Sequence, residues 1–211
     1  MMGVVGPPLL GERLRFSFIA SLVLLLSFFV TLPLLVLVLL GEGGELLGYV
    51  IVLVNILEIP FMLLVLYGFV LLGRFRGFGL LVYPVLLLAL VYVFFIVVDS
   101  VGVWLGWSGG GFFELLGLVY FLVSGCLSVV FSVGLLQLRD VVGWLSSVLG
   151  VLFFVQGLFG VLFALFSFFD SVVGLFFYLG GFILYVFVYP VMAAFFFKAR
   201  RVYGGGVGGA V

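Results

Sequence analysis

Long uninterrupted runs of apolar residues, separated by short polar segments, dominate the chain. A helix rises about 1.5 Å per residue, so about 20 apolar residues are needed to cross the roughly 30 Å hydrocarbon core of a bilayer. Six runs are long enough: Phe16–Leu40, Leu46–Leu72, Leu80–Leu105, Leu115–Leu136, Val141–Phe168 and Val172–Phe197. None shows the alternating polarity of transmembrane strands. The pattern therefore predicts an all-α, polytopic integral membrane protein, a six-transmembrane-helix bundle arranged as three helical hairpins.

Composition agrees with this class of protein. Of the 211 residues, 67% are hydrophobic and 8% are charged, whereas soluble domains are roughly half apolar and a quarter charged. Small hydrophobic proteins of prokaryotes have a similar composition. We therefore expect the lipid bilayer to be the main partner of the chain, and we expect a multi-pass location in the plasma membrane.

All the basic residues lie next to the same ends of the predicted helices. They are Arg13, Arg15, Arg74, Arg76, Arg139, Lys198, Arg200 and Arg201. The opposite ends carry acids without bases: Glu42, Glu45, Asp99, Glu114 and Asp170. Because short loops with Lys and Arg stay in the cytoplasm, we expect both termini to be cytoplasmic. Residues 1–15 then form a cytoplasmic segment, residues 16–197 the transmembrane domain, and residues 198–211 a basic and then glycine-rich flexible tail.

Several classes of function lack the residues that they need. Histidine is absent, and the single cysteine, Cys126, cannot build a disulfide or a zinc cluster, so we predict no metal site and no cofactor. Acidic and basic residues are equal in number, which leaves no basic surface for nucleic acid. Nucleophilic or metal-assisted catalysis would need a base beside Ser or Cys, or a set of ligands. We therefore expect the chain not to be an enzyme.

One acid, Glu58, lies near the middle of the second run and thus close to the bilayer midplane. A charged acid there costs about 2.5–3.5 kcal/mol on insertion scales, so we expect Glu58 to be neutral or partnered at pH 7. Asn55 lies one helical turn earlier, on the same face. Pro60 lacks an N–H, so it should free the carbonyl of Ile56 and bend the helix. This turn therefore presents a carboxyl, an amide and a freed carbonyl together.

Other helices carry polar side chains at a similar depth. At this depth lie the amide of Gln156 and the hydroxyls of Ser27, Thr31, Tyr92 and Tyr185. Of these residues, Gln156, Thr31 and Tyr185 form a candidate mid-membrane binding site with Glu58 and Asn55. Such a site is typical of proton and cation sites in transporters. Alternatively, it is a structural cluster that fixes helix register, with a protonated Glu58 bonded to Asn55 or Gln156.

Small residues mark a predicted helix-packing face, because helices in lipid associate through close approach of small side chains. Ser124, Ser128 and Ser132 repeat along the fourth run, and Gly157 and Gly160 lie on the fifth. We expect these two helices to pack closely, either with each other or with a second copy of the chain.

Two classes of function remain. The first is a scaffold or accessory subunit of a membrane complex, because small-residue faces, many phenylalanines and the lack of a soluble domain suit packing against a homo-oligomer or another membrane protein. The alternative is a transporter or channel for a proton, a small cation or an apolar solute, which would use the site around Glu58. Few polar groups are available, and this counts against large polar substrates. The sequence favours the scaffold, mainly by exclusion.

Overall fold

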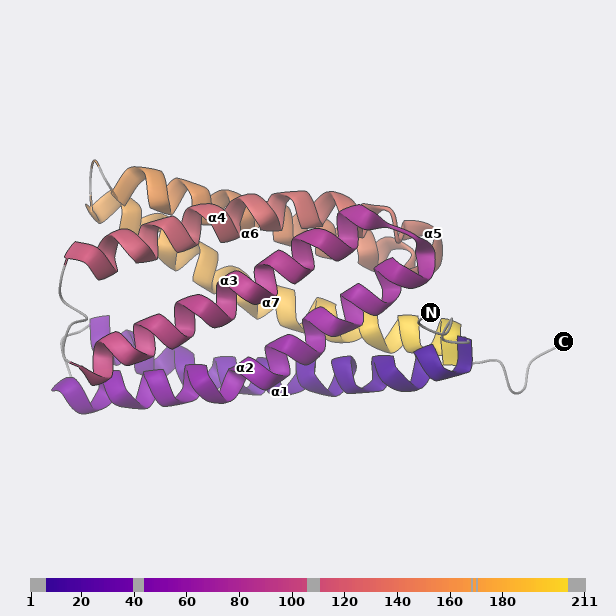
Figure 1. The fold of residues 1–211 in the computed structure, drawn as a ribbon, viewed down its shortest axis with the longest axis horizontal. Helices are drawn as coiled ribbons and strands as arrows, with labels where there is room; N and C mark the ends of the chain where they lie inside the picture. The colour runs from indigo at the N-terminus through magenta and orange to yellow at the C-terminus, as the bar shows by residue number, and fades with distance from the viewer. Residues whose placement is uncertain (1–6, 40–43, 106–110, 168, 170, 205–211) are drawn as a thin grey trace, which may run out of the picture.

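The computed structural model describes residues 7–39, 44–105, 111–167, 169 and 171–204. Its long helices are α1 (Pro7–Leu39), α2 (Gly44–Arg76), α3 (Gly79–Trp104), α4 (Gly111–Leu136), α6 (Trp144–Ser167) and α7 (Ser171–Gly204) (Figure 1). A short helix, α5 (Arg139–Val142), connects α4 to α6. No strand occurs in these ranges, and six helices are long and apolar enough to cross a membrane. The predicted all-α bundle of six apolar helices is therefore confirmed.

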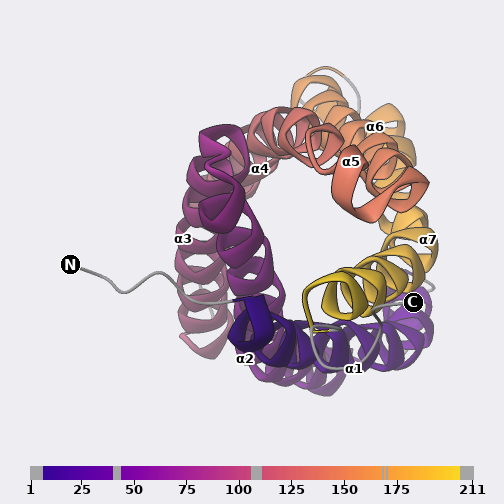
Figure 2. The same ribbon diagram turned by 90° about the vertical axis from the view of Figure 1, so that its right-hand side faces the viewer.

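The six long helices form a closed ring in chain order. Each helix packs against the one before it and the one after it, and α7 returns to pack against α1. Figure 2, which looks along the bundle, shows this arrangement. At the closing contact, a Cβ atom added to Gly11 would lie 2.5 Å from the Cα atom of Gly204. A ring of this kind surrounds a central space, so the size of the inward side chains decides whether that space is filled or hollow.

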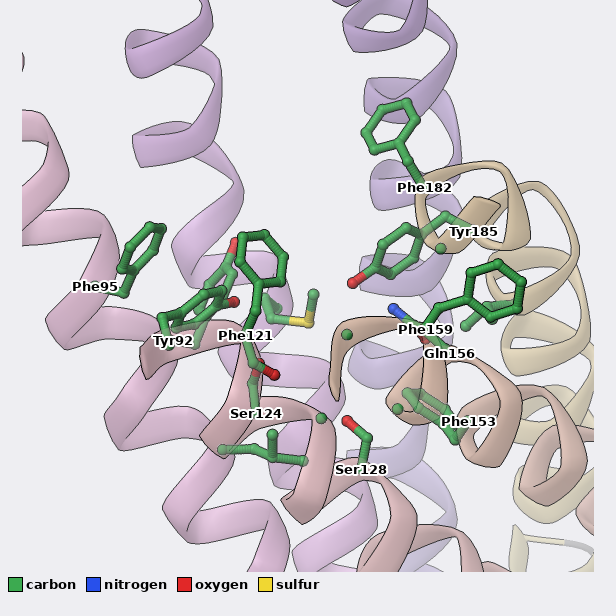
Figure 3. A pocket seen from close by; sticks show the side chains of 18 of the residues that line it. Tyr92, Phe95, Phe121, Ser124, Ser128, Phe153, Gln156, Phe159, Phe182 and Tyr185 are labelled. Atoms are coloured by element: carbon green, nitrogen blue, oxygen red, sulfur yellow. The ribbon is translucent and has the colours of Figure 1, made fainter. Parts of the chain in front are cut away.

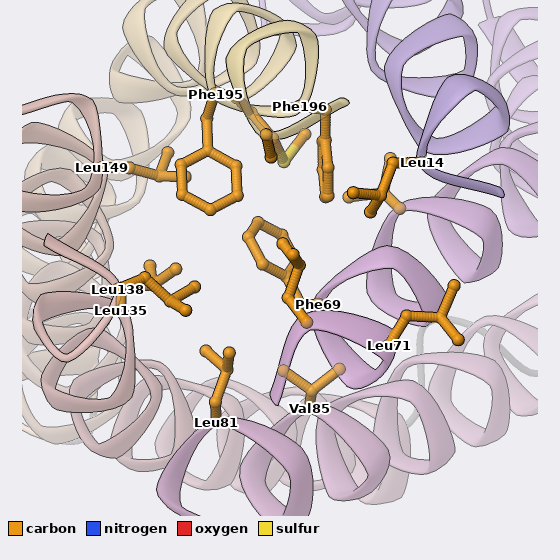
Figure 4. Packing of buried hydrophobic residues seen from close by; sticks show 14 of the residues in the cluster. Leu14, Phe69, Leu71, Leu81, Val85, Leu135, Leu138, Leu149, Phe195 and Phe196 are labelled. Atoms are coloured by element: carbon orange, nitrogen blue, oxygen red, sulfur yellow. The ribbon is translucent and has the colours of Figure 1, made fainter. Parts of the chain in front are cut away.

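Large apolar side chains fill the ring at one end. This end, which we call the basic end, carries Arg13, Arg15, Arg74, Arg76, Arg139, Lys198, Arg200 and Arg201. Phe69 lies fully buried at its centre, and its ring centroid is 5.0 Å from that of Phe131 and 4.7 Å from that of Phe196 (Figure 4). The ring centroid of Phe195 lies 5.5 Å from that of Phe69. We call the side chains of Phe69, Phe131, Phe195 and Phe196 the aromatic plug. They close the space between the helices at the basic end, because tilted and edge-on aromatic contacts pack densely.

Three helices extend by several residues beyond their apolar runs at the basic end. α1 begins at Pro7, α2 continues to Arg76 and α7 continues to Gly204. Residues 7–15, assigned to a separate segment from the sequence, and residues 198–204, assigned to a flexible tail, are therefore helical. Hydropathy marks where a helix leaves the hydrocarbon core, whereas backbone hydrogen bonding continues into water. Arg201 in the last turn of α7 also stabilises that helix end through the helix dipole.

The predicted helix Val141–Phe168 begins at Trp144 instead, because the short helix α5 precedes it. Gly143 separates α5 from α6 with a φ of 71°, a backbone conformation that favours glycine. The N–H of Gly143 donates to the carbonyl of Arg139 at 2.8 Å, which closes α5. Phe168 itself lies outside the described residues.

α4 and α6 make the most extensive helix contact of the ring, and paired glycines allow it. A Cβ atom added to Gly125 would lie 2.7 Å from the carbonyl oxygen of Gly157, and one added to Gly157 would lie 2.6 Å from the carbonyl oxygen of Gly125. At Gly160 an added Cβ atom would lie 3.3 Å from the carbonyl oxygen of Phe121. The two backbones therefore touch within one chain, in the way expected for small residues in membranes.

Candidate functional site

A cavity of about 320 Å³ lies inside the ring, and all six long helices contribute to its wall. Phe69 of the aromatic plug is part of the lining and forms its floor. Glycines on α4, α6 and α7 are part of the cavity lining, and because they have no side chain they leave this space unfilled. They are Gly125, Gly157, Gly160 and Gly181. The polar members of the lining are Thr31, Asn55, Glu58, Tyr92, Tyr120, Ser124, Ser128, Gln156, Tyr178, Tyr185 and Tyr189.

Glu58 carries the only carboxyl group among the described residues that line the cavity. Its side chain is half-buried, and its Oε1 atom accepts a hydrogen bond from the hydroxyl of Ser27 on α1. Thr31, one turn further along α1, donates to the carbonyl of Ser27 at 3.0 Å. The sequence suggested Asn55 or Gln156 as the partner of Glu58, but the bond that forms crosses from the neighbouring helix α1. The carboxyl of Glu58 in α2 is thus held by a hydroxyl donor from α1.

Gln156 on α6 lies beside Tyr185 on α7. The hydroxyl of Tyr185 points toward the side-chain amide of Gln156, and the two side chains interact (Figure 3). The Oε1 atom of Gln156 is buried and has no hydrogen-bond partner within the described part of the chain. A buried acceptor without a donor is unfavourable. Because Gln156 lines the cavity, a small rotation of its side chain would let this oxygen accept a hydrogen bond from a ligand in the cavity.

Tyrosine rings make up much of the wall. Five of them line the cavity: Tyr92, Tyr120, Tyr178, Tyr185 and Tyr189. Tyr185 and Tyr189 stack on each other, with ring centroids 5.2 Å apart, and both line the cavity together with Glu58. The faces of aromatic rings attract cations, most strongly where water is excluded. A carboxyl surrounded by such rings favours a positively charged ligand over a negatively charged one.

The residues proposed from the sequence come together here. Glu58, Asn55, Gln156, Thr31 and Tyr185 all line the one cavity. Four of the residues assigned to helix packing line it as well; they are Ser124, Ser128, Gly157 and Gly160. Ser132 does not, and its buried hydroxyl donates to the carbonyl of Val129 at 2.6 Å. The packing face and the candidate site are therefore parts of one surface of α4 and α6.

Three tyrosines of the wall were missed from the sequence: Tyr120, Tyr178 and Tyr189. On α7 the signal was present, because Tyr178, Phe182, Tyr185 and Tyr189 repeat at helical spacing and so share one face. Aromatic residues at this spacing are also typical of an ordinary core, and nothing in the pattern says that the face borders a cavity.

The carbonyl of Ile56, which the sequence predicted to join Glu58 and Asn55 because Pro60 lacks an N–H, does not line the cavity. Pro60 and Ile56 are exposed on the outer face of α2, and neither lines the cavity. Asn55 and Glu58 point into the ring, and residues two positions away from Glu58 on a helix point in nearly the opposite direction. The polar groups of α2 in the cavity are therefore side chains.

Comparison with protein families, curated proteins and solved structures gives no match to this chain. Its class follows from the structure: six long apolar helices indicate a multi-pass membrane protein. Within that class, a closed ring of helices surrounds a cavity that combines one carboxyl, two amides and several tyrosine rings. This cavity is the candidate functional site.

Proposed function

We propose that the chain is a membrane carrier that binds a proton or a small cation in the central cavity, with Glu58 as the ionisable group. The observation that carries this proposal is the convergence of Glu58, Asn55 and Gln156 on one cavity inside the ring. Ligand sites typically have volumes of about 300–1,000 Å³ and a few polar groups in an apolar wall. The volume here, about 320 Å³, favours a small solute.

Glu58 suits the exchange of a proton for another cation. A carboxylate deep in a bilayer is unfavourable unless it is protonated or paired with a positive charge. Binding of a cation can therefore accompany release of the proton, so that the site keeps the same net charge. The Ser27 hydroxyl donates to the carboxyl and helps to hold it in the cavity.

The aromatic plug favours a carrier over an open channel. Phe69, Phe131, Phe195 and Phe196 are all fully buried, so the ring is closed at the basic end. A solute can pass this end only if the rings move apart. Alternating exposure of a central site is the usual behaviour of carriers.

We also propose that the basic end faces the cytoplasm in a cell membrane. Every Lys and Arg of the chain lies at this end, and the exposed acid Glu114 lies at the start of α4, at the other end. Short segments rich in Lys and Arg remain on the cytoplasmic side. α1 starts and α7 ends at the basic end, beside each other, which would direct both termini to the cytoplasm.

The scaffold hypothesis has less support than the carrier hypothesis. It rested mainly on exclusion and, in part, on small-residue faces that could pack against a partner. The small residues of α4 and α6 line the cavity or the contact between these two helices. Because one chain closes its own ring, we propose that a single copy in lipid forms the site. We also propose transport without catalysis, because the lining combines one carboxyl with amides and hydroxyls and offers no nucleophile–base pair of known type.

Flux in reconstituted vesicles tests the carrier proposal. We expect the native protein to carry protons, monovalent metal cations or methylammonium down a gradient faster than protein-free vesicles. Glu58→Gln should abolish this flux, because the amide cannot release a proton or balance a cation. Glu114→Gln is the matched control, since Glu114 is exposed outside the cavity, and it should behave as native. Native protein without flux above empty vesicles for any of these probes contradicts the proposal.

A further inference from the structure

A second hollow, of about 330 Å³, lies on the outer face of the ring in the seam between α3 and α4. We call it the α3–α4 groove; it is lined by Leu90, Val91, Phe94, Phe95, Leu116, Val119, Tyr120 and Val123. Leu90 and Phe94 are 68% and 59% exposed, so the groove opens away from the ring and toward lipid. Its lining is apolar almost throughout, in contrast to the cavity inside. α3 also packs less extensively against α4 than α6 does, so this seam is among the looser ones of the ring.

The groove and the cavity share a wall. Phe95 and Tyr120 line both hollows, and among the described residues they are the two that do so. Their rings stack face to face, with centroids 4.0 Å apart and planes at 14°. One stacked pair of side chains therefore separates the lipid-facing groove from the cavity that holds Glu58.

This partition consists of side chains alone. Phe95 and Tyr120 belong to different helices, and they meet through the flat faces of their rings. Rotation of one ring about its side-chain bonds would remove the stack without separating the backbones of the two helices.

We propose that the solute of the central cavity is a single-chain organic cation dissolved in the bilayer, and that it enters sideways between α3 and α4 with the Phe95–Tyr120 pair as the gate. This inference rests on the proposed carrier function and names its substrate class and entry route. The α3–α4 groove offers an apolar surface to the tail of such a molecule. Behind the gate, the carboxyl of Glu58 and the tyrosine faces balance the charge of its head group.

Access of an apolar reagent to Glu58 tests the route. Dicyclohexylcarbodiimide dissolves in the bilayer and forms adducts with buried carboxyl groups, so its rate of reaction with full-length protein in vesicles reports access from lipid. Mass spectrometry follows the adduct, and Glu58→Gln identifies the reacting residue. Val123→Trp places a large ring in the groove. Leu122→Trp is the matched control, because Leu122 neighbours Val123, is equally exposed at 38%, and lines neither hollow.

We expect Val123→Trp to slow the labelling of Glu58 several-fold and Leu122→Trp to leave it at the native rate. Phe95→Ala, which removes half of the gate, should accelerate it several-fold. Equal rates in the two tryptophan variants overturn the route, and so does a native protein that is not labelled at all. These outcomes do not depend on flux, so a failed route is distinguishable from a failed carrier proposal.

Competition tests the substrate class. Octyltrimethylammonium should slow the labelling of Glu58 several-fold, because its head group occupies the site beside the carboxyl. Octanesulfonate has the same chain length and the opposite charge, and it should have no effect. Equal protection by the two amphiphiles, or protection by neither, overturns the assignment to organic cations.

Discussion

The hydroxyl of Ser27 is the residue-scale feature that fixes Glu58 in the cavity. Two hydroxyls of α1 bond to their own helix: Ser21 donates to the carbonyl of Ser17 at 2.8 Å, and Thr31 donates to the carbonyl of Ser27 at 3.0 Å. Ser17 donates to a backbone carbonyl of α2, that of Leu64, at 2.7 Å. Ser27 instead donates across to the carboxyl of Glu58 on α2. A hydrogen bond to a charged group contributes about 1.5–3 kcal/mol, so this bond is strong enough to determine where the carboxyl lies.

Ser27→Ala should therefore weaken the site without destroying it. Loss of about 1.5 kcal/mol corresponds to about a tenfold rise in the cation concentration that gives half-maximal flux. Ser21→Ala is the control, since it removes a hydroxyl of the same helix that does not contact Glu58. Concentration dependence of flux in vesicles measures both variants. A half-maximal concentration unchanged in Ser27→Ala would show that the bond does not position the carboxyl.

Residue positions could be predicted from the sequence where helix geometry alone decides them. Glu58 and Asn55 lie one turn apart, so they had to share a face, and depth along the helices brought Gln156 and Tyr185 to the same level. The partner of Glu58 could not be predicted this way. Ser27 reaches it because α1 packs against α2 with this face toward Glu58, and the apolar pattern does not say how each helix is rotated about its own axis.

At the scale of elements, the contact between α4 and α6 depends on two facing glycines. Gly125→Ala would place a Cβ atom 2.7 Å from the carbonyl oxygen of Gly157, which is closer than side chains approach. Overpacking of this kind costs about 1–3 kcal/mol, so we expect the free energy of unfolding to fall by that amount. At Gly117 on the same helix an added Cβ atom would have no neighbour within 4 Å, so Gly117→Ala should lose no stability.

Denaturation in mixed detergent micelles, followed by circular dichroism, measures both α4 variants. Equal stability of Gly125→Ala and Gly117→Ala would mean that the helices do not approach as closely as described.

The turn between α2 and α3 depends on the backbone of Gly77. Its φ is 71°, and the N–H of Phe78 donates to the carbonyl of Gly73 at 2.8 Å, the arrangement of a Schellman cap. Gly77→Ala meets no atom within 4 Å, so its cost of about 1–2 kcal/mol in unfolding free energy is that of the left-handed backbone alone. Gly77→Asn should lose less, because Asn tolerates this conformation. Native stability in the Ala variant would contradict the assigned turn.

Helix centres could be predicted from the sequence more accurately than helix ends. Six apolar runs correspond to six spanning helices, because the bilayer sets a minimum length for each. Three ends at the basic side were missed, since α1, α2 and α7 continue as helices past their apolar runs. The break at Gly143 was missed for a similar reason. Val141 and Val142 are apolar, so they look like the start of the next membrane helix, but the backbone conformation of Gly143 separates α5 from α6.

At the scale of the whole molecule, ring closure and the cavity were beyond prediction. In a water-soluble bundle the polar face of each helix identifies the outside, but in lipid both the outside and the interior are apolar. Hydrophobicity therefore does not say which face of a helix points inward. The few polar residues carry that information, because Glu58, Asn55 and Gln156 all line one cavity inside the ring.

The proposed orientation predicts which residues an impermeant reagent can reach. Cys126 is exposed, so single cysteines are introduced into a Cys126→Ala background. In intact cells, Glu114→Cys should react with a membrane-impermeant maleimide and Arg74→Cys should react after lysis only. Both positions are exposed and lie at opposite ends of the bundle. Reaction of both variants in intact cells would contradict the orientation.

The proposed carrier depends on the carboxyl of Glu58, inside the ring, for its transport step. The most direct measurement compares saturable cation flux in vesicles for Glu58→Gln and Glu58→Asp, with equal amounts of folded protein confirmed by circular dichroism. Asp keeps the charge and moves it back by one methylene group, so part of the native flux should survive, whereas Gln keeps the shape and should carry none. Native flux in Glu58→Gln would contradict the proposed role of the Glu58 carboxyl in transport.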